Sequence, residues 1–205
     1  GKRNHATRHA SPKVGTHKPS GLQVVRYHSQ SNDYHEFKEI KNIRTVFWVM
    51  SKTSGNSGSL LCHPSAHHFY SNGDKFWHPK HTHEHIRNGN LRINGMKANA
   101  ESIYPNKLSV VSLRTTGDVI ASRFGKDRNH GGKYNWNGEI GELIIFSEAL
   151  KDEQIEQIEN HLISKWKVMS GNENTYGKPM AYLSFDDREG NRYPNSADTT
   201  KGTST

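Results

Sequence analysis

The sequence predicts an all-β protein, a two-sheet antiparallel β-sandwich with one C-terminal amphipathic helix. Two observations predict the β class. Short runs of β-branched and aromatic residues alternate with polar loops, and the chain is only 31% apolar, with 18 glycines. Both features suit many short strands better than a helical bundle. The third observation predicts the helix, because apolar residues recur at helical spacing over residues 150–166.

The amino-terminal quarter of the chain predicts one loop and two strands. Residues 1–20 are polar and contain Pro12 and Pro19, so they predict an extended loop with little strand content. The β-branched and aromatic runs 22–28 and 43–50 predict the first two strands. The polar segment between these runs predicts a connection.

The middle of the chain predicts shorter strands joined by tight turns. Residues 60–70 predict a short, irregular strand. Two Asn-Gly turns, Asn88-Gly89 and Asn94-Gly95, enclose a short apolar run and predict a small hairpin. Residues 108–114 and 119–124 predict two antiparallel strands, because a Thr-Gly-Asp segment between them suits a tight connection.

A buried strand followed by one helix is the strongest pattern in the chain. Residues 139–146 carry apolar side chains on both faces, which predicts a strand covered on both sides. The helix follows, with Asp152 and Glu153 favourable at its start and Lys165 at its end. Before it, residues 125–138 form a long polar loop, and such loops often carry recognition residues.

Together these segments resemble the concanavalin A-like, or laminin G-like, jelly-roll superfamily, as found in secreted bacterial multidomain proteins. The resemblance lies in GKRNHAT, IRTVFWVM, LRINGMKAN and the strand-helix unit of residues 136–166. It implies a β-sandwich domain over residues 1–168. The family usually has Ser or Thr where this chain has Lys151, and lysine cannot accept the hydrogen bond that caps a helix.

The remaining residues predict a linker over 169–179 and an extra strand with a tail over 180–205. The strand, Ala181 to Asp187, resembles the opening strand of a following domain, whereas the resemblance implies that an opening strand is missing before residue 1. An unpaired sheet edge favours strand addition. We therefore expect this segment to fill a vacant edge, in its own chain or in a neighbouring copy.

Composition excludes several classes of function. No run of eighteen apolar residues exists, so we expect no membrane insertion. Cys62 is the only cysteine, which excludes an internal disulfide and a cysteine-rich zinc site. The net charge of +8 favours polyanions. Nucleic acid has no recognition motif to support it, so acidic polysaccharide is the favoured partner.

Catalytic and metal sites are not predicted. Glu139 and Glu142 are three residues apart on a strand and point to opposite faces, so they cannot form the carboxylate pair of a glycosidase. We therefore expect no enzyme activity. Calcium is common in the superfamily, and the resemblance leaves Asp186 and Asp187 as weak candidate ligands.

Histidines could hold zinc, copper or nickel if the HTHEH segment were extended, because His81, His83 and His85 would then share one face. Exposed histidines on a polar loop are the favoured alternative, and no metal site is assigned.

Aromatic residues beside polar loops predict sugar binding, because a sugar ring stacks on an aromatic face while polar side chains bind its hydroxyl groups. Trp48, Trp136 and Trp166 follow strand or helix patterns and are predicted in the core. Trp77 is the predicted exposed platform. The predicted ligand-binding residues are Tyr70, Trp77, His81, His83, His85, Arg87, Arg128 and Tyr134.

The sequence thus predicts a non-catalytic carbohydrate-binding or adhesion module of a secreted or cell-surface protein. Its alternative is a structural subunit of a surface assembly or filament, joined by strand donation through Ala181 to Asp187.

Overall fold

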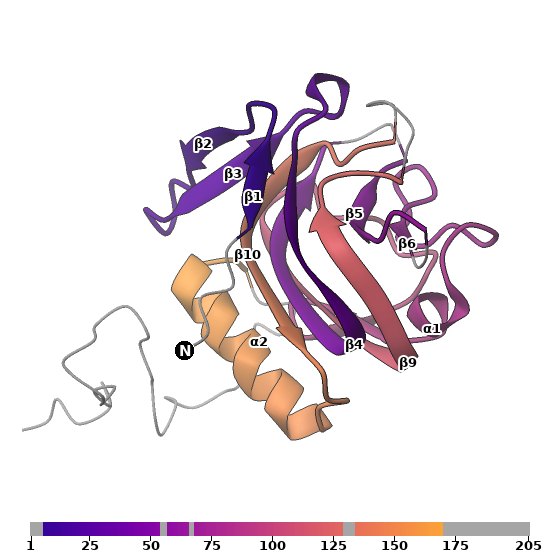
Figure 1. Cartoon of the computed structure of the whole chain (residues 1–205). Helices are drawn as coiled ribbons and strands as arrows, with labels where there is room; N and C mark the ends of the chain where they lie inside the picture. The colour runs from indigo at the N-terminus through magenta and orange to yellow at the C-terminus, as the bar shows by residue number, and fades with distance from the viewer. Residues whose placement is uncertain (1–5, 54–56, 66–67, 129–133, 170–205) are drawn as a thin grey trace, which may run out of the picture. The chain divides into compact units, whose positions relative to one another are not determined.

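The computed structural model describes residues 6–53, 57–65, 68–128 and 134–169, which lie within one compact unit (Figure 1). The described residues form a mostly antiparallel β-sheet with one long C-terminal helix, which confirms the predicted fold class. The strands are β1 (Thr7–His9), β2 (Lys13–Thr16), β3 (Gln23–Tyr27), β4 (Tyr34–Lys52), β5 (Ser59–Cys62), β6 (His68–Tyr70), β7 (Asn90–Ile93), β8 (Met96–Ala98), β9 (Ser109–Phe124) and β10 (Gly138–Phe146). The helices are η1 (Ser29–Ser31), α1 (Glu84–Arg87) and α2 (Asp152–Trp166).

The described strands form one continuous hydrogen-bonded network in the order β2-β3-β10-β4-β9-β5-β6. In addition, β1 pairs with β4, and β7 pairs with β8 and β9. The long strands β4 and β9 run side by side through its centre (Figure 1). The finer prediction of two separate jelly-roll sheets stays a prediction, because this network is continuous through β4 and β9.

The prediction of two strands joined by a tight turn within residues 108–124 is wrong, because β9 is a single bent strand. Both of its halves pair antiparallel with β4. The bend is taken up by register shifts between Glu36 and Thr45 of β4, where extra residues bulge out of the ladder. The Thr115 hydroxyl donates to the Gly117 carbonyl at 2.7 Å, so the polar segment is satisfied without a reversal.

The amino-terminal region holds more strand than the sequence predicts. The polar segment before residue 43 is not a connection, since β4 begins at Tyr34. β1 and β2 occupy part of the predicted loop. Most residues of β1 and β2 are polar, and their side chains are partly or wholly exposed. Both strands therefore lack the apolar runs by which a strand is recognised in a sequence. The segment from Ala181 to Asp187 lies outside the described residues.

The predicted hairpin is confirmed at Asn94-Gly95, whereas Asn88-Gly89 follows the end of α1. β7 and β8 pair antiparallel across Asn94 and Gly95, whose φ angles of 49° and 82° are both left-handed. Asparagine and glycine are the residues that adopt this conformation most readily, and it matches the twist of a two-residue hairpin. β10 and α2 also follow the prediction.

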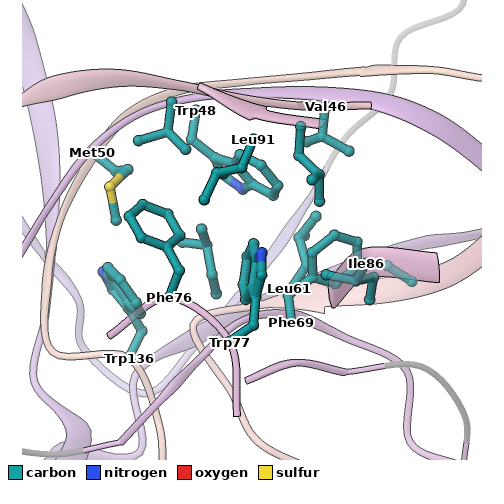
Figure 2. Close-up of a cluster of buried hydrophobic side chains, with 14 of the residues drawn as sticks. Val46, Trp48, Met50, Leu61, Phe69, Phe76, Trp77, Ile86, Leu91 and Trp136 are labelled. Carbon is teal, nitrogen blue, oxygen red and sulfur yellow. The ribbon is translucent and has the colours of Figure 1, made fainter. Parts of the chain in front are cut away.

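Two apolar clusters form the core. The first lies among β4, β5, β6, β7 and β9 and contains Trp48 and Trp136 (Figure 2). The second lies under α2 and contains Trp166. Leu143 and Ile145 of β10 pack on the first cluster, whereas Ile144 and Phe146 pack on the second, so β10 is covered on both sides as predicted. The first cluster contains the following side chains: Tyr27, Ile43, Val46, Trp48, Met50, Leu60, Leu61, Phe69, Phe76, Trp77, Ile86, Leu91, Tyr104, Val111, Leu113, Val119, Ala121, Trp136 and Ile140.

A buried ion pair fixes α2 to the sheet. Glu159 of α2 is only 1% exposed. Both of its carboxylate oxygens accept hydrogen bonds from Arg92 Nε of β7, at 3.0 and 3.1 Å, and Ser112 Oγ of β9 donates to it at 2.5 Å. Burial raises the pKa of Glu159, because water is removed from its charged form. None of the helices in the described ranges is long and apolar enough to cross a membrane.

The N-terminus of α2 lacks a side-chain cap, which leads to a first prediction. The Gln154 side chain accepts from the Lys151 amide at 2.9 Å, but a lysine ammonium cannot accept from the helix amides in return. Lys151→Ser should therefore raise the free energy of unfolding by about 0.5–2 kcal/mol. Urea unfolding measures the gain. Lys151→Ala is the control, and an equal gain in both variants would contradict the capping explanation.

Candidate functional site

Four aromatic side chains gather on the outer face of β6 and the loops beside it. Phe69 is buried in the core, so the next residue, Tyr70, points outward. The centre of its ring lies 5.9 Å from that of His78, 6.2 Å from His81 and 6.0 Å from Tyr134. The rings of His78 and His81 are 4.3 Å apart. We call these four residues the tyrosine–histidine cluster.

Local hydrogen bonds hold this cluster in place. The Tyr70 carbonyl accepts from the Thr82 hydroxyl at 2.6 Å and from the His78 amide at 2.9 Å. His78 Nδ1 accepts from the amides of Lys80 and His81, at 3.1 and 3.3 Å. The turn is thus tied to β6 and is closed around the His78 ring.

Arg87 supports the same turn from α1. Its guanidinium donates to the Pro79 carbonyl. The structure therefore places this predicted ligand-binding residue next to the cluster, where one of its donors already has a protein partner.

Two polar groups of the cluster have shifted pKa values. Burial raises the pKa of the Tyr70 hydroxyl, and the nearby Asp127 carboxylate raises it further. Burial lowers the pKa of His78, and the positive charges of His81 and Lys80 lower it further. Both shifts favour the neutral form, so the Tyr70 hydroxyl and the His78 ring offer aromatic faces with neutral hydrogen-bonding groups.

Trp77 is not an exposed platform, so this prediction is wrong. Its side chain is 1% exposed and lies in the first core cluster (Figure 2). Its ring packs edge-on against Phe69 at 6.1 Å and against Phe76 at 5.4 Å. The polar residues around it in the sequence hide this burial, because the first core cluster also gathers side chains from distant strands, such as Trp48 of β4 and Val111 of β9. The adjacent aromatic residue Phe76 is the one local signal of a buried segment.

The HTHEH segment is not extended, so its three histidines do not share one strand face. It forms a turn and the start of α1. His83 caps this helix, with Nδ1 accepting from the His85 amide at 3.2 Å. Its ring lies 5.0 Å from that of His85, whose Nδ1 lies 3.0 Å from the Thr116 hydroxyl oxygen. Burial lowers the pKa of His83, and the nearby His85 lowers it further.

Metal ligands do not come together in the part of the chain that the structure describes. There, no group of three or more His, Cys, Asp or Glu side chains could hold a metal ion. The weak calcium candidates Asp186 and Asp187 lie outside the described residues.

Arg128 lies with two other cations at the end of β9. Arg123 of β9 donates from Nη1 to the Arg128 carbonyl at 3.4 Å. The Lys126 ammonium lies 4.2 Å from the centre of the Tyr34 ring, and the Arg123 guanidinium lies 5.9 Å from it. We call Arg123, Lys126 and Arg128 the cationic group. Sequence reasoning found only Arg128, since the other two lie in segments that read as ordinary strand and loop.

The cationic group and the tyrosine–histidine cluster flank the same loop. Arg128 and Tyr134 are the described residues on either side of residues 129–133 in the sequence. Its base is fixed to β5, since the Ser59 amide donates to the Tyr134 carbonyl at 3.0 Å and the Gly125 amide donates to the Leu60 carbonyl at 3.3 Å. The prediction that this loop carries recognition residues stays a prediction.

The two strand carboxylates considered for catalysis are engaged in separate contacts. Glu139 accepts from Arg26 at 2.7 Å. Glu142 accepts from the Trp166 indole at 2.8 Å and lies 3.5 Å from the Lys165 ammonium. Each therefore has a structural role in joining β10 to a neighbouring element.

Comparisons with protein-family models, curated proteins and solved structures give no match to this chain. The laminin G-like resemblance accordingly stays a prediction, and the function is argued from the site alone.

Proposed function

We propose that this chain is a non-catalytic carbohydrate-binding or adhesion module of a secreted or cell-surface protein. The observation that supports it is the tyrosine–histidine cluster, in which Tyr70, His78, His81 and Tyr134 come together on an outer face. Aromatic faces stack on the apolar faces of sugar rings, and hydroxyl and imidazole groups bind sugar hydroxyls. The net charge of +8 favours an acidic polysaccharide among such ligands.

Removing the two tyrosine rings tests this proposal. The Tyr70→Ala/Tyr134→Ala double variant should bind at least about tenfold more weakly to the glycans that the wild-type protein retains, because each stacked ring contributes roughly 0.5–1.5 kcal/mol beyond its buried area. A glycan array of neutral and acidic sugars, read at low and high salt, identifies the ligands. Calorimetry then measures their affinities.

A matched control separates binding from folding. His17→Ala changes a half-buried aromatic residue of the β2–β3 turn and should leave glycan affinity unchanged. The double variant must also keep a cooperative thermal transition. If the wild-type protein binds no glycan at low salt, or if the folded double variant binds as tightly as the wild type, the proposal is wrong.

A free sheet edge favours a second candidate function, the assembly of copies into a surface filament by strand donation. Among the described residues β2 pairs with β3 alone, and Val14 on β2 is 64% exposed. Such an edge can accept an extended strand. The proposed donor, Ala181 to Asp187 of a neighbouring copy, lies outside the described residues. Light scattering tests this function, since salt-resistant polymers would support it and a monomer at high concentration would exclude it.

A further inference from the structure

We infer that the cationic group, Arg123, Lys126 and Arg128, is a second binding subsite that recognises the sulfate or carboxylate groups of an acidic polysaccharide. This inference rests on the proposed function, because it assigns the charged part of the same ligand whose sugar rings contact the tyrosine–histidine cluster.

The fold, not the sequence spacing, assembles this subsite. In the central sheet Glu36 of β4 lies opposite Arg123 of β9, and Tyr34 lies opposite His9 of β1. Phe124 packs against the core, so its neighbour Arg123 points to the outer face. The chain leaves β9 directly after this point, which brings Lys126 over Tyr34.

Lys126 is held in place without being neutralised. The His9 ring stacks on the Tyr34 ring at 4.2 Å and 2°, and the Lys126 ammonium lies 4.2 Å from the centre of the same ring. Cation–π attraction orients an ammonium but leaves its net charge in place. The Cys62 thiol donates to the Lys126 carbonyl at 2.8 Å, which fixes the backbone.

Burial raises the pKa of the Cys62 thiol to about 12, so at neutral pH it is an uncharged donor and adds no negative charge to the group.

Among the described residues, the carboxylates near the group form no ion pair with two of its three cations. Glu36 accepts from Arg123 at 2.9 Å and also lies 3.4 Å from His9, so its charge is used within the sheet. Asp127 is 5% exposed, and the Ser59 hydroxyl donates to it at 3.3 Å. Within the described ranges, no ion pair involves Lys126 or Arg128, so their positive charges are free to bind an anion.

The position of the group favours a polysaccharide over a nucleic acid. β9 and β6 are separated by β5, so Arg123 and Tyr70 lie on strands about 10 Å apart across the sheet, and Lys126 lies over Tyr34 of β4, one strand further away. Tyr70 and Arg123 both point to the outer face of this part of the sheet. One chain of linked sugars can therefore present a ring to the tyrosine–histidine cluster and an acidic group to the cations. A nucleic acid would need a longer run of cations along its backbone.

A matched pair of polymers tests the inference, namely dextran sulfate and uncharged dextran. Lys126→Gln/Arg128→Gln should bind dextran sulfate at least about tenfold more weakly than the wild type, since two charge-assisted contacts are lost. It should also show a weaker dependence of affinity on salt. Lys97→Gln/Lys107→Gln removes the same charge from exposed lysines of the β8 strand and the loop before β9, and it should stay within about twofold of the wild type. Polygalacturonate distinguishes carboxylate from sulfate recognition.

The outcomes separate this inference from the proposed function. If the two glutamine double variants lose equal affinity, binding follows net charge and the subsite is wrong. If that result accompanies a loss of binding in Tyr70→Ala/Tyr134→Ala, the carbohydrate function stands without the subsite. If only Lys126→Gln/Arg128→Gln loses affinity, the function assigned to the tyrosine–histidine cluster fails. Duplex DNA serves as a competitor. If it displaces the bound polysaccharide at a lower concentration of negative charge than dextran sulfate does, the assigned ligand class is wrong.

Discussion

Glu159→Ala should lower the free energy of unfolding by about 3–5 kcal/mol, because it leaves the Arg92 guanidinium without its buried partner. Glu159 is 1% exposed and the Arg92 side chain is 12% exposed, so water cannot replace the lost contact. Ser112 loses its acceptor as well. Chemical denaturation monitored by tryptophan fluorescence measures the change.

The neighbouring residue Glu156 supplies the control. It lies 3.5 Å from Arg92 but is 48% exposed, so Glu156→Ala should cost less than about 1 kcal/mol.

Glu159→Gln gives a second comparison, through pH. Folding raises the pKa of Glu159, so protonation of its carboxyl group stabilises the folded state. This stabilisation is complete below the pKa that Glu159 has in the unfolded chain, and it is lost as pH rises through its pKa in the folded protein. Stability of the wild type relative to Glu159→Gln should therefore increase as pH falls from 7. A decrease over this range would contradict the assignment.

Trp77→Ala should lower the free energy of unfolding by about 3–5 kcal/mol, because it empties a large volume in the first core cluster. The Trp77 ring contacts Phe69 and Phe76 and is among the largest fully buried side chains. Thermal and urea unfolding measure the loss. A platform exposed to solvent would lose almost no stability on the same substitution.

Trp77→Phe distinguishes packing from hydrogen bonding. The Trp77 indole nitrogen has no hydrogen-bond partner among the described residues, so an aromatic replacement removes volume but none of the described polar contacts. It should cost less than half of the loss in Trp77→Ala and leave glycan affinity unchanged. Weaker glycan binding in a stable Trp77→Phe variant would return this residue to the ligand site.

The sequence predicts the elements whose apolar residues repeat at strand or helix spacing within a single segment. β10 shows apolar residues on both faces, and α2 shows them at helical spacing, because each packs on a core cluster along most of its length. The β7–β8 hairpin is predicted for a different reason. Its Asn94-Gly95 turn needs a backbone conformation that few other residue pairs adopt easily.

The parts that the sequence misses depend on pairing between distant segments. The first half of β4 is polar, and its strand character comes from β1 on one side and β9 on the other. The burial of Trp77 likewise depends on strands far away in the chain. Arg123 and Lys126 escape detection because the β4–β9 register, which no local pattern encodes, brings them to Tyr34.

The candidate site is predicted in part. Tyr70, His81 and Tyr134 do lie together, and Arg128 lies on the other side of the same loop. His83 and His85 form a separate pair, because the segment turns into α1. Residue type and loop position thus predict part of a candidate site, whereas its division into an aromatic part and a cationic part needs the fold.

The pairing of β4 with β9, which lie far apart in the chain, also affects how the protein folds during synthesis. β4 emerges first with its most apolar stretch, Val46 to Met50, fully buried in the final structure. Its neighbours β9 and β10 follow only after many further residues. Until both have left the ribosome, that stretch has no partner on either side and is open to contacts with other nascent chains. We therefore expect production of this domain to depend strongly on slow translation or on chaperones that bind unfolded chains. Production of a protein built from local hairpins should depend on them less.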